Sequence, residues 1–136
     1  MIKPIMKSEF FLRLPSEDAG PDDAATGQDL LDTLNEHECE CVGLAANMIG
    51  VRKRIICVKD GNRALLMYNP QILEQVNAYQ TSEGCLSLTG ERPCTRYRRI
   101  KVEYLDENFV HRIKNFSGYT AEIIQHEIDH CNGVVI

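Results

Sequence analysis

Two histidines and a glutamate near the end of the sequence have the spacing of a hydrolytic metal site. In QHEIDH, at residues 125–130, His126 and His130 stand four positions apart, and Glu127 follows the first of them. On a helix this spacing places both imidazoles on one face, within reach of a single metal ion. The carboxylate beside the first ligand can then reach a water that the metal activates, without being a ligand itself. The pattern favours a metal-dependent hydrolase.

A short pattern such as HExxH is a weak signal by itself, because it also occurs by chance on solvated helices. The residues around it argue against that alternative. Ile123, Ile124 and Ile128 lie on the same expected helix, so at least part of the helix packs against a core.

A catalytic metal of this kind needs a third protein ligand, which in the better-known zinc proteases follows the motif. Here only CNGVVI follows, and Cys131 is too close on the same helix to complete the site. The third ligand is therefore expected upstream, among the other cysteines, His37, His111 and the carboxylates. Of these, Cys85 in SEGCLSL has a glycine before it that lets backbone approach closely, and a thiolate binds Zn²⁺ or Fe²⁺ strongly. Cys85 is the favoured candidate.

Length and composition indicate one globular domain with a single core, expected over residues 1–136. No apolar run approaches the roughly 20 residues that span a bilayer, and the N-terminal segment does not resemble a signal peptide. The net charge of −5 argues against non-specific binding to nucleic acid. Six cysteines without a secretion signal indicate reduced thiols in a cytoplasmic protein.

One stretch, ERPCTRYRRIK, is locally basic against this acidic balance. It contains Arg92, Arg96, Arg98, Arg99 and Lys101. We expect these side chains on a solvated strand face, and the alternative is a docking patch for an anionic partner.

Two helices are expected, one early and one at the end of the chain. Asp22 or Asp23 can cap the first, which is expected to run to about Glu38. Its buried face is expected to hold Leu30, Leu31 and Leu34. Residues 119–131 have the apolar spacing of the second, amphipathic helix.

Strands are expected to fill the region between these helices. The β-branched and alternating segments are residues 54–59, 64–68, 100–105 and 109–113, with 71–80 and 81–88 as further extended chain. The strand at 64–68 is expected to stop at Asn69-Pro70. Strands followed by a late helix indicate an α+β domain, with antiparallel or mixed strands packed around a C-terminal metal-binding helix and with an N-terminal helix.

The sequence resembles the peptide deformylase family over nearly its whole length. Three motifs carry the resemblance, in the family's order and approximate spacing: VGLAA at 42–46, EGCLS at 83–87 and QHEIDH at 125–130. The pairing of EGCLS with QHExDH is the specific part, whereas VGLAA alone is not. Members of this family remove the N-formyl group from the initiating methionine of nascent bacterial and organellar proteins.

The resemblance implies a role for the residues of these motifs. Cys85, His126 and His130 would bind one divalent metal, Fe²⁺ in the cell, with Zn²⁺, Ni²⁺ or Co²⁺ in a purified sample. Glu127 would take a proton from the metal-bound water and later deliver it to the leaving amine. The backbone N–H of Leu86 would donate to the oxyanion of the tetrahedral intermediate.

The resemblance also implies how the peptide binds. The extended backbone at Gly43 would pair with the substrate as an added β-strand. The expected substrate-binding residues are Val42, Gly43, Leu44, Met48, Glu83 and Gly84. Glu83 is further expected to orient a histidine or to hold the local loop, with Arg96 paired to it.

The first motif departs from the family's pattern. Where the family has Gly-aliphatic-Gly-aliphatic-Ala-Ala-x-Gln, this sequence has CVGLAANM at residues 41–48. Met48 therefore replaces a glutamine that is the second donor to the oxyanion, and a thioether cannot donate a hydrogen bond. Loss of such a donor costs about 10²–10³ in rate. Asn47 could substitute only if the local backbone turned.

Three hypotheses follow from this pattern. The chain is a deformylase of formyl-methionyl peptides, a deformylase-like amidase with another substrate or with weak activity, or a silent homologue that keeps the metal for structure or binding. The intact ligands and Glu127 argue against the silent homologue, whereas Met48 argues against full activity. We favour the first hypothesis.

The resemblance implies a cytoplasmic monomer that binds a formyl-methionyl peptide, without binding nucleic acid or membrane itself. A transient contact with the ribosome is a separate hypothesis. Many family members continue past the third motif into a segment that in some of them helps ribosome docking. Here six residues follow QHEIDH, so that docking is not carried over to this sequence.

Overall fold

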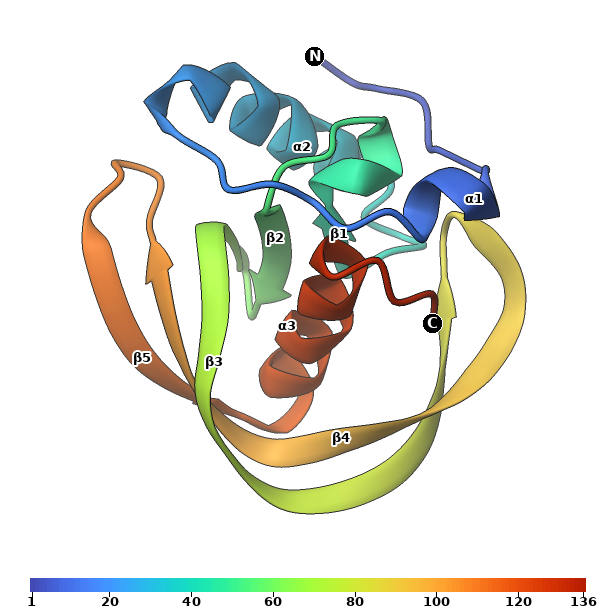
Figure 1. Ribbon diagram of the computed structural model, residues 1–136, viewed down its shortest axis with the longest axis vertical. Coiled ribbons are helices and arrows are strands. Elements are labelled where there is room, and N and C mark those ends of the chain that lie inside the picture. The colour runs from blue at the N-terminus through green and yellow to red at the C-terminus, as the bar shows by residue number, and fades with distance from the viewer.

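The computed structural model describes residues 1–136 as a five-stranded antiparallel sheet that curves around a central helix (Figure 1). The elements are α1 (Glu9–Leu12), the 3₁₀ turn η1 (Pro21–Asp23), α2 (Ala24–Glu36), β1 (Gly43–Ala45), the 3₁₀ turn η2 (Ala46–Ile49), β2 (Ile55–Asp60), β3 (Arg63–Cys85), β4 (Leu88–Leu105), β5 (His111–Ser117) and α3 (Gly118–Cys131). The strands follow one another in sequence order across the sheet, and every ladder is antiparallel. The expected α+β fold is confirmed.

The central helix, α3, lies in the hollow of the sheet and packs against β1, β2 and β4 (Figure 1). Its three isoleucines, Ile123, Ile124 and Ile128, are buried, as the apolar spacing predicted. On α2, Leu30 and Leu34 are fully buried against the core, while Leu31 is half-buried. Both predicted helices are confirmed, and no helix is long and apolar enough to cross a membrane.

The prediction that a strand stops at Asn69-Pro70 is wrong, because β3 continues through these residues to Cys85. The register with β4 shifts between Tyr68 and Gln71, so Pro70 falls in a bulge where its missing N–H costs no ladder bond. Asn69 takes a left-handed conformation with φ 53°, which asparagine tolerates. Its side-chain amide also bonds to both the N–H and the C=O of Ala19. A bulge of this kind bends the strand that carries it.

Two predicted boundaries also shift. The last strand is β5, His111–Ser117, rather than residues 109–113, because the Asp106 carboxylate accepts the backbone N–H groups of Asn108 and Val110 and closes a turn there. The first helix ends at Glu36, and Asp23 accepts the Gly20 N–H instead of capping α2 with its side chain.

Candidate active site

The two histidines and the cysteine singled out in the sequence converge on one point. Cys85 is the last residue of β3, whereas His126 and His130 project from one face of α3. Cys85 Sγ lies 3.4 Å from His130 Nε2, and the two histidine Nε2 atoms lie 3.2 Å apart. All three ligand atoms lie within 4.8 Å of one another. None of the other candidates for the third ligand belongs to this cluster, whether His37, His111, the other cysteines or the carboxylates.

This geometry fits a metal ion. Tetrahedral bonds of about 2.3 Å to sulfur and 2.0–2.1 Å to nitrogen separate the ligand atoms by about 3.3–3.6 Å, close to the separations observed here. His130 is fully buried, and burial lowers the pKa of its imidazole to about 3, so the ring is neutral as a ligand must be. A Cys/His/His metal site is therefore present.

A chain of charged side chains orients His126. Its Nδ1 atom lies 2.7 Å from Glu83 Oε1, which leaves Nε2 directed at the cluster. Arg96 donates hydrogen bonds to the same carboxylate from Nε at 3.1 Å and Nη2 at 2.7 Å, and its Nη1 atom donates to Asp129 at 2.7 Å. Although burial opposes ionisation, hydrogen bonds from His126 and Arg96 hold the pKa of Glu83 well below its ordinary value. A fixed anion behind a ligand histidine sets its orientation and basicity.

The same contacts act on His126 itself. Burial lowers its pKa, but the hydrogen bonds with Cys85 and Glu83 prevail and raise it to about 10 in the metal-free protein. A metal that binds at Nε2 must therefore displace a proton.

Replacing Glu83 with glutamine is expected to weaken metal affinity by about 10–100-fold, the usual cost of losing the partner of a ligand histidine. A neutral amide cannot offer His126 and Arg96 the negative charge that both now contact. The affinity can be measured by competition with a chromogenic chelator. The control is Glu91→Gln, a glutamate on β4 that also lines the cavity. Equal affinities for the two variants would show that Glu83 does not orient the ligand.

Gln125 ties α3 to β4 at the level of the site. Its side-chain amide accepts the Tyr97 N–H and donates to the Tyr97 C=O, both at 2.8 Å. These two bonds replace those that a neighbouring strand would make to the Tyr97 backbone, and they hold α3 against β4. It explains why a glutamine can precede the first histidine at a buried position, where polar groups need partners.

Glu127 is buried at the inner wall of a cavity, next to β1. Its Oε1 atom has no hydrogen-bond partner in the protein, and burial raises the pKa of the carboxyl to about 7. A Cβ on Gly43 would lie 2.9 Å from Glu127 Oε2 and 2.7 Å from Ile123 Cγ2, so only glycine lets β1 approach α3 this closely. The carboxylate is therefore available for a substrate or water in the cavity.

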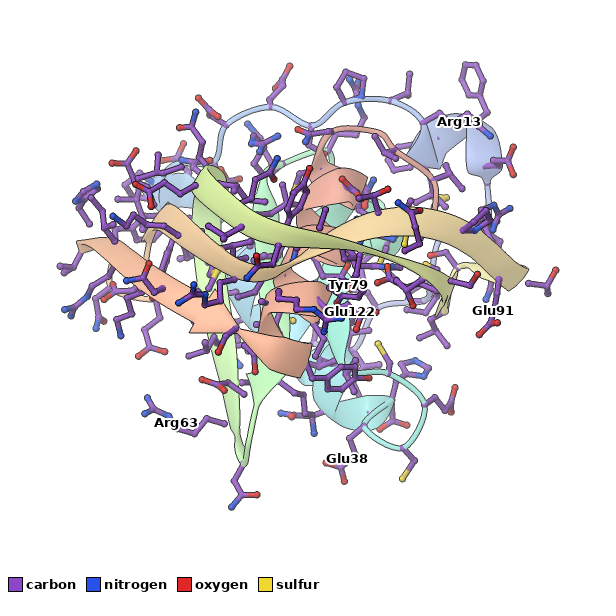
Figure 2. All side chains as sticks on the ribbon, turned by 90° about the horizontal axis from the view of Figure 1, so that it is seen from below. Arg13, Glu38, Arg63, Tyr79, Glu91 and Glu122 are labelled. Atoms are coloured by element: carbon purple, nitrogen blue, oxygen red, sulfur yellow. The ribbon has the colours of Figure 1, made fainter.

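The cavity has a volume of about 480 Å³ and opens beside the metal site. Its lining includes Val42, Gly43, Met48, Glu83, Gly84, Cys85, Leu86, His126 and Glu127. Glu38, in the loop after α2, and Glu91 on β4 add acidic side chains to the lining, and both are labelled in Figure 2. Leu44 does not line it, because its side chain is fully buried in the core.

The backbone of β1 is open toward this cavity. Because β1 is an edge strand, only β2 pairs with it. The Lys59 N–H donates to the Val42 C=O at 2.8 Å. Hydrogen-bonded and non-bonded positions alternate along an antiparallel strand, so the N–H and C=O of the next residue, Gly43, point away from β2. The Gly43 C=O accepts the Cys41 thiol at 2.8 Å. An extended peptide in the cavity could pair with this free edge.

Met48 also lines the cavity, but it offers no donor. Its Sδ atom accepts the Ala45 N–H at 3.4 Å, and the residue is 1% exposed. The neighbouring Asn47 is directed elsewhere, since its amide donates to the His130 C=O at 2.9 Å. Asn47 therefore braces the backbone of a ligand instead of replacing the glutamine that the family places at position 48.

The sequence places Arg96 in a stretch expected on a solvated basic face, and it assigns Asp129 no role. Arg96 is instead 4% exposed, and only its pairing with Glu83 was expected. Asp129 had a usable signal, since it stands three positions after His126 on the helix. Its partner lies on β4, which the local pattern does not reveal.

This site combines a thiolate and two neutral imidazoles, which can hold a metal, with a buried carboxylate that lines the same cavity. Such a site can activate water to attack a bound carbonyl. This is the chemistry of a metal-dependent hydrolase. A family model described as polypeptide deformylase matches residues 6–136, and the chain belongs to the peptide deformylase family, whose members are metal-dependent hydrolases of formylated peptides.

Individual relatives agree. The chain is 51% identical to a peptide deformylase of Clostridium beijerinckii over 136 residues, the whole length of both proteins. Among solved structures, peptide deformylase from Thermotoga maritima has a TM-score of 0.90 at 29% identity, covering 99% of this chain and 95% of that one. A class I type b peptide deformylase from Acinetobacter baumannii, bound to Met-Ala-Ser, has a TM-score of 0.89 at 28% identity and covers 99% and 97%.

Proposed function

We propose that this chain removes the N-formyl group from the N-terminal methionine of nascent proteins, as a single catalytic domain. The observation that carries the proposal is the convergence of Cys85, His126 and His130 beside Glu127 in a cavity bordered by a free strand edge. A solved relative that holds Met-Ala-Ser, a tripeptide beginning with methionine, supports the choice of substrate. The alternative substrate raised by Met48 has no support among the relatives.

A divalent metal held by these three residues would, when bound, supply Lewis-acid polarisation of the formyl carbonyl and acidify water. Glu127 takes a proton from the water that attacks the formyl carbon. The C–N bond then breaks, Glu127 delivers the proton to the departing amine, and formate leaves. Burial raises the pKa of this carboxyl to about 7 in the metal-free protein, which is the direction expected for a group that must both accept and return a proton.

The peptide is proposed to lie along β1, with its backbone paired to Gly43 and its course bordered by Val42 and Gly84. Leu44 offers the peptide no group, because its side chain belongs to the core and, by the same alternation, its N–H and C=O face β2. The N–H of Leu86, which follows the ligand Cys85, is proposed to donate to the oxyanion. The short separation in sequence keeps the donor next to the metal.

The native ion is proposed to be Fe²⁺, with Zn²⁺, Ni²⁺ and Co²⁺ able to bind the same thiolate and imidazoles. We further propose that the enzyme acts as a monomer in the cytoplasm, where nascent chains carry the formyl group. Any contact with the ribosome is proposed to be transient.

The proposal is tested with metal-reconstituted protein on formyl-Met-Ala-Ser and acetyl-Met-Ala-Ser. We expect only the formyl peptide to be hydrolysed, with release of formate, and we expect this activity to be abolished by a chelator and restored by the divalent metal. Cleavage of the acetyl peptide at a similar rate would identify a general amidase. No release of formate, with one metal bound per chain, would overturn the proposal.

A further inference from the structure

The N-terminal segment crosses the gap between the two walls of the proposed oxyanion site. The Met6 N–H donates to the C=O of Met48 on η2, and the ammonium of the next residue, Lys7, donates to the C=O of Leu86, both at 2.7 Å. Glu9 pairs with Arg92 on β4 at 3.5 Å. Figure 1 shows α1 beside the end of the hairpin that β3 and β4 form.

Leu86 lies in the tight turn between these strands, directly after Cys85. On its N-terminal side, Cys85 is held by its place in the metal cluster, and Cys85 Sγ also accepts the Ser87 N–H at 3.4 Å. On its C-terminal side, Lys7 holds the Leu86 C=O. The peptide groups on both sides of Leu86 are thus fixed, and with them the direction of its N–H.

The direction of this N–H matters more here than where two donors share the oxyanion. Met48 accepts a hydrogen bond from Ala45 and donates none. Asn47 is committed to the His130 C=O. A single donor must therefore be well aimed, because displacement of a reacting group by about 1 Å can cost 10²-fold in rate.

We propose that Lys7 is a positioning residue, which holds the turn at Leu86 so that its N–H stays directed at the formyl oxygen. The inference rests on the proposed function for its catalytic consequence. Lys7 touches no reacting atom and acts through the Leu86 backbone. Its side chain is exposed, so it contributes little to folding, and its loss should appear in turnover rather than in melting temperature.

The test compares Lys7→Met, Lys7→Arg and the control Lys3→Met in metal-loaded protein. Lys3 belongs to the same segment, and its ammonium lies 3.9 Å from Asp29, away from the turn. For Lys7→Met we expect kcat on formyl-Met-Ala-Ser to fall about three- to tenfold with KM less changed, because a charge-assisted hydrogen bond is lost from the turn but the donor remains. Lys7→Arg should restore most of the rate, and Lys3→Met should match the parent.

A second measurement does not depend on turnover. Amide hydrogen exchange at Ser87, whose N–H bonds to Cys85 Sγ within the turn, should be faster in Lys7→Met than in the parent, with metal content and melting temperature unchanged. Unchanged exchange would overturn the proposal whether or not the parent hydrolyses formyl peptides. Faster exchange with an unchanged kcat would also overturn it, because the turn would then be held without consequence for the reaction. An inactive parent with faster exchange would overturn the catalytic role together with the proposed function.

Discussion

Replacing Glu127 with glutamine is expected to lower kcat by about 10²–10⁴-fold, the range typical for loss of a positioned acid and base. The amide keeps the size and shape of the carboxylate but cannot accept a proton from water. KM should change less, because Glu127 acts on the water and the leaving amine rather than on the bound peptide backbone. The measurement is steady-state kinetics on formyl-Met-Ala-Ser with the metal content of each preparation determined in parallel.

The fold of this variant should remain intact. Burial raises the pKa of Glu127 to about 7 from an ordinary 4.5, so the folded metal-free protein favours the neutral carboxyl. Its contribution to stability is therefore lost as the pH rises from about 4.5 to 7, and a permanently neutral glutamine avoids this loss. Metal-free Glu127→Gln should melt no lower than the parent above pH 7. Glu36→Gln, at the end of α2 and outside the cavity lining, is the control with unchanged kinetics. Near-normal turnover in Glu127→Gln would show that another group moves the proton.

The helices were predictable because each carries its signal locally. The spacing of Ile124 and Ile128 indicated the buried face of α3, and the leucines of α2 did the same. The course of β3 could not be predicted locally, because a proline normally ends a strand. The bulge that accommodates Pro70 depends on pairing with β4. The bond between the Asn69 side chain and Ala19 that supports this bulge joins residues far apart in sequence.

The residues of the site likewise divide into those that the local sequence predicts and those that depend on contacts between distant segments. His126 and His130 follow from helix geometry, and Cys85 followed from its glycine context and from the family's motifs. The set of side chains behind them depends on contacts between strands and helix. A buried Arg96 looks like its solvated neighbours until β4 is placed against α3, where Asp129 and Glu83 neutralise it. Lys7 is the extreme case, since a lysine near the N-terminus contacts a turn beyond β3.

A substitution at Met48 is expected to give the largest increase in kcat. Met48→Gln should raise kcat about tenfold or more on formyl-methionyl peptides, with a ceiling near the 10²–10³ that a full oxyanion donor supplies. The two side chains are similar in length, and the local contacts suit the change. A glutamine Oε1 can accept the Ala45 N–H that Sδ now accepts, which leaves its Nε2 donor for the cavity. KM should change less, because the neutral carbonyl is a weaker acceptor than the oxyanion.

Met48→Leu is the matched control, because it keeps an apolar side chain of similar volume and adds no donor, so its kcat should not rise. If the parent is already efficient and Met48→Gln brings no gain, the Leu86 N–H is sufficient by itself or a water acts as the second donor. If neither protein releases formate while the metal is bound, Met48 belongs to a site shaped for a different amide. Lys7→Met can also be combined with Met48→Gln. If the double variant has a smaller gain in kcat than Met48→Gln alone, both walls of the oxyanion site, η2 and the turn at Leu86, must be held at the correct separation for the reaction.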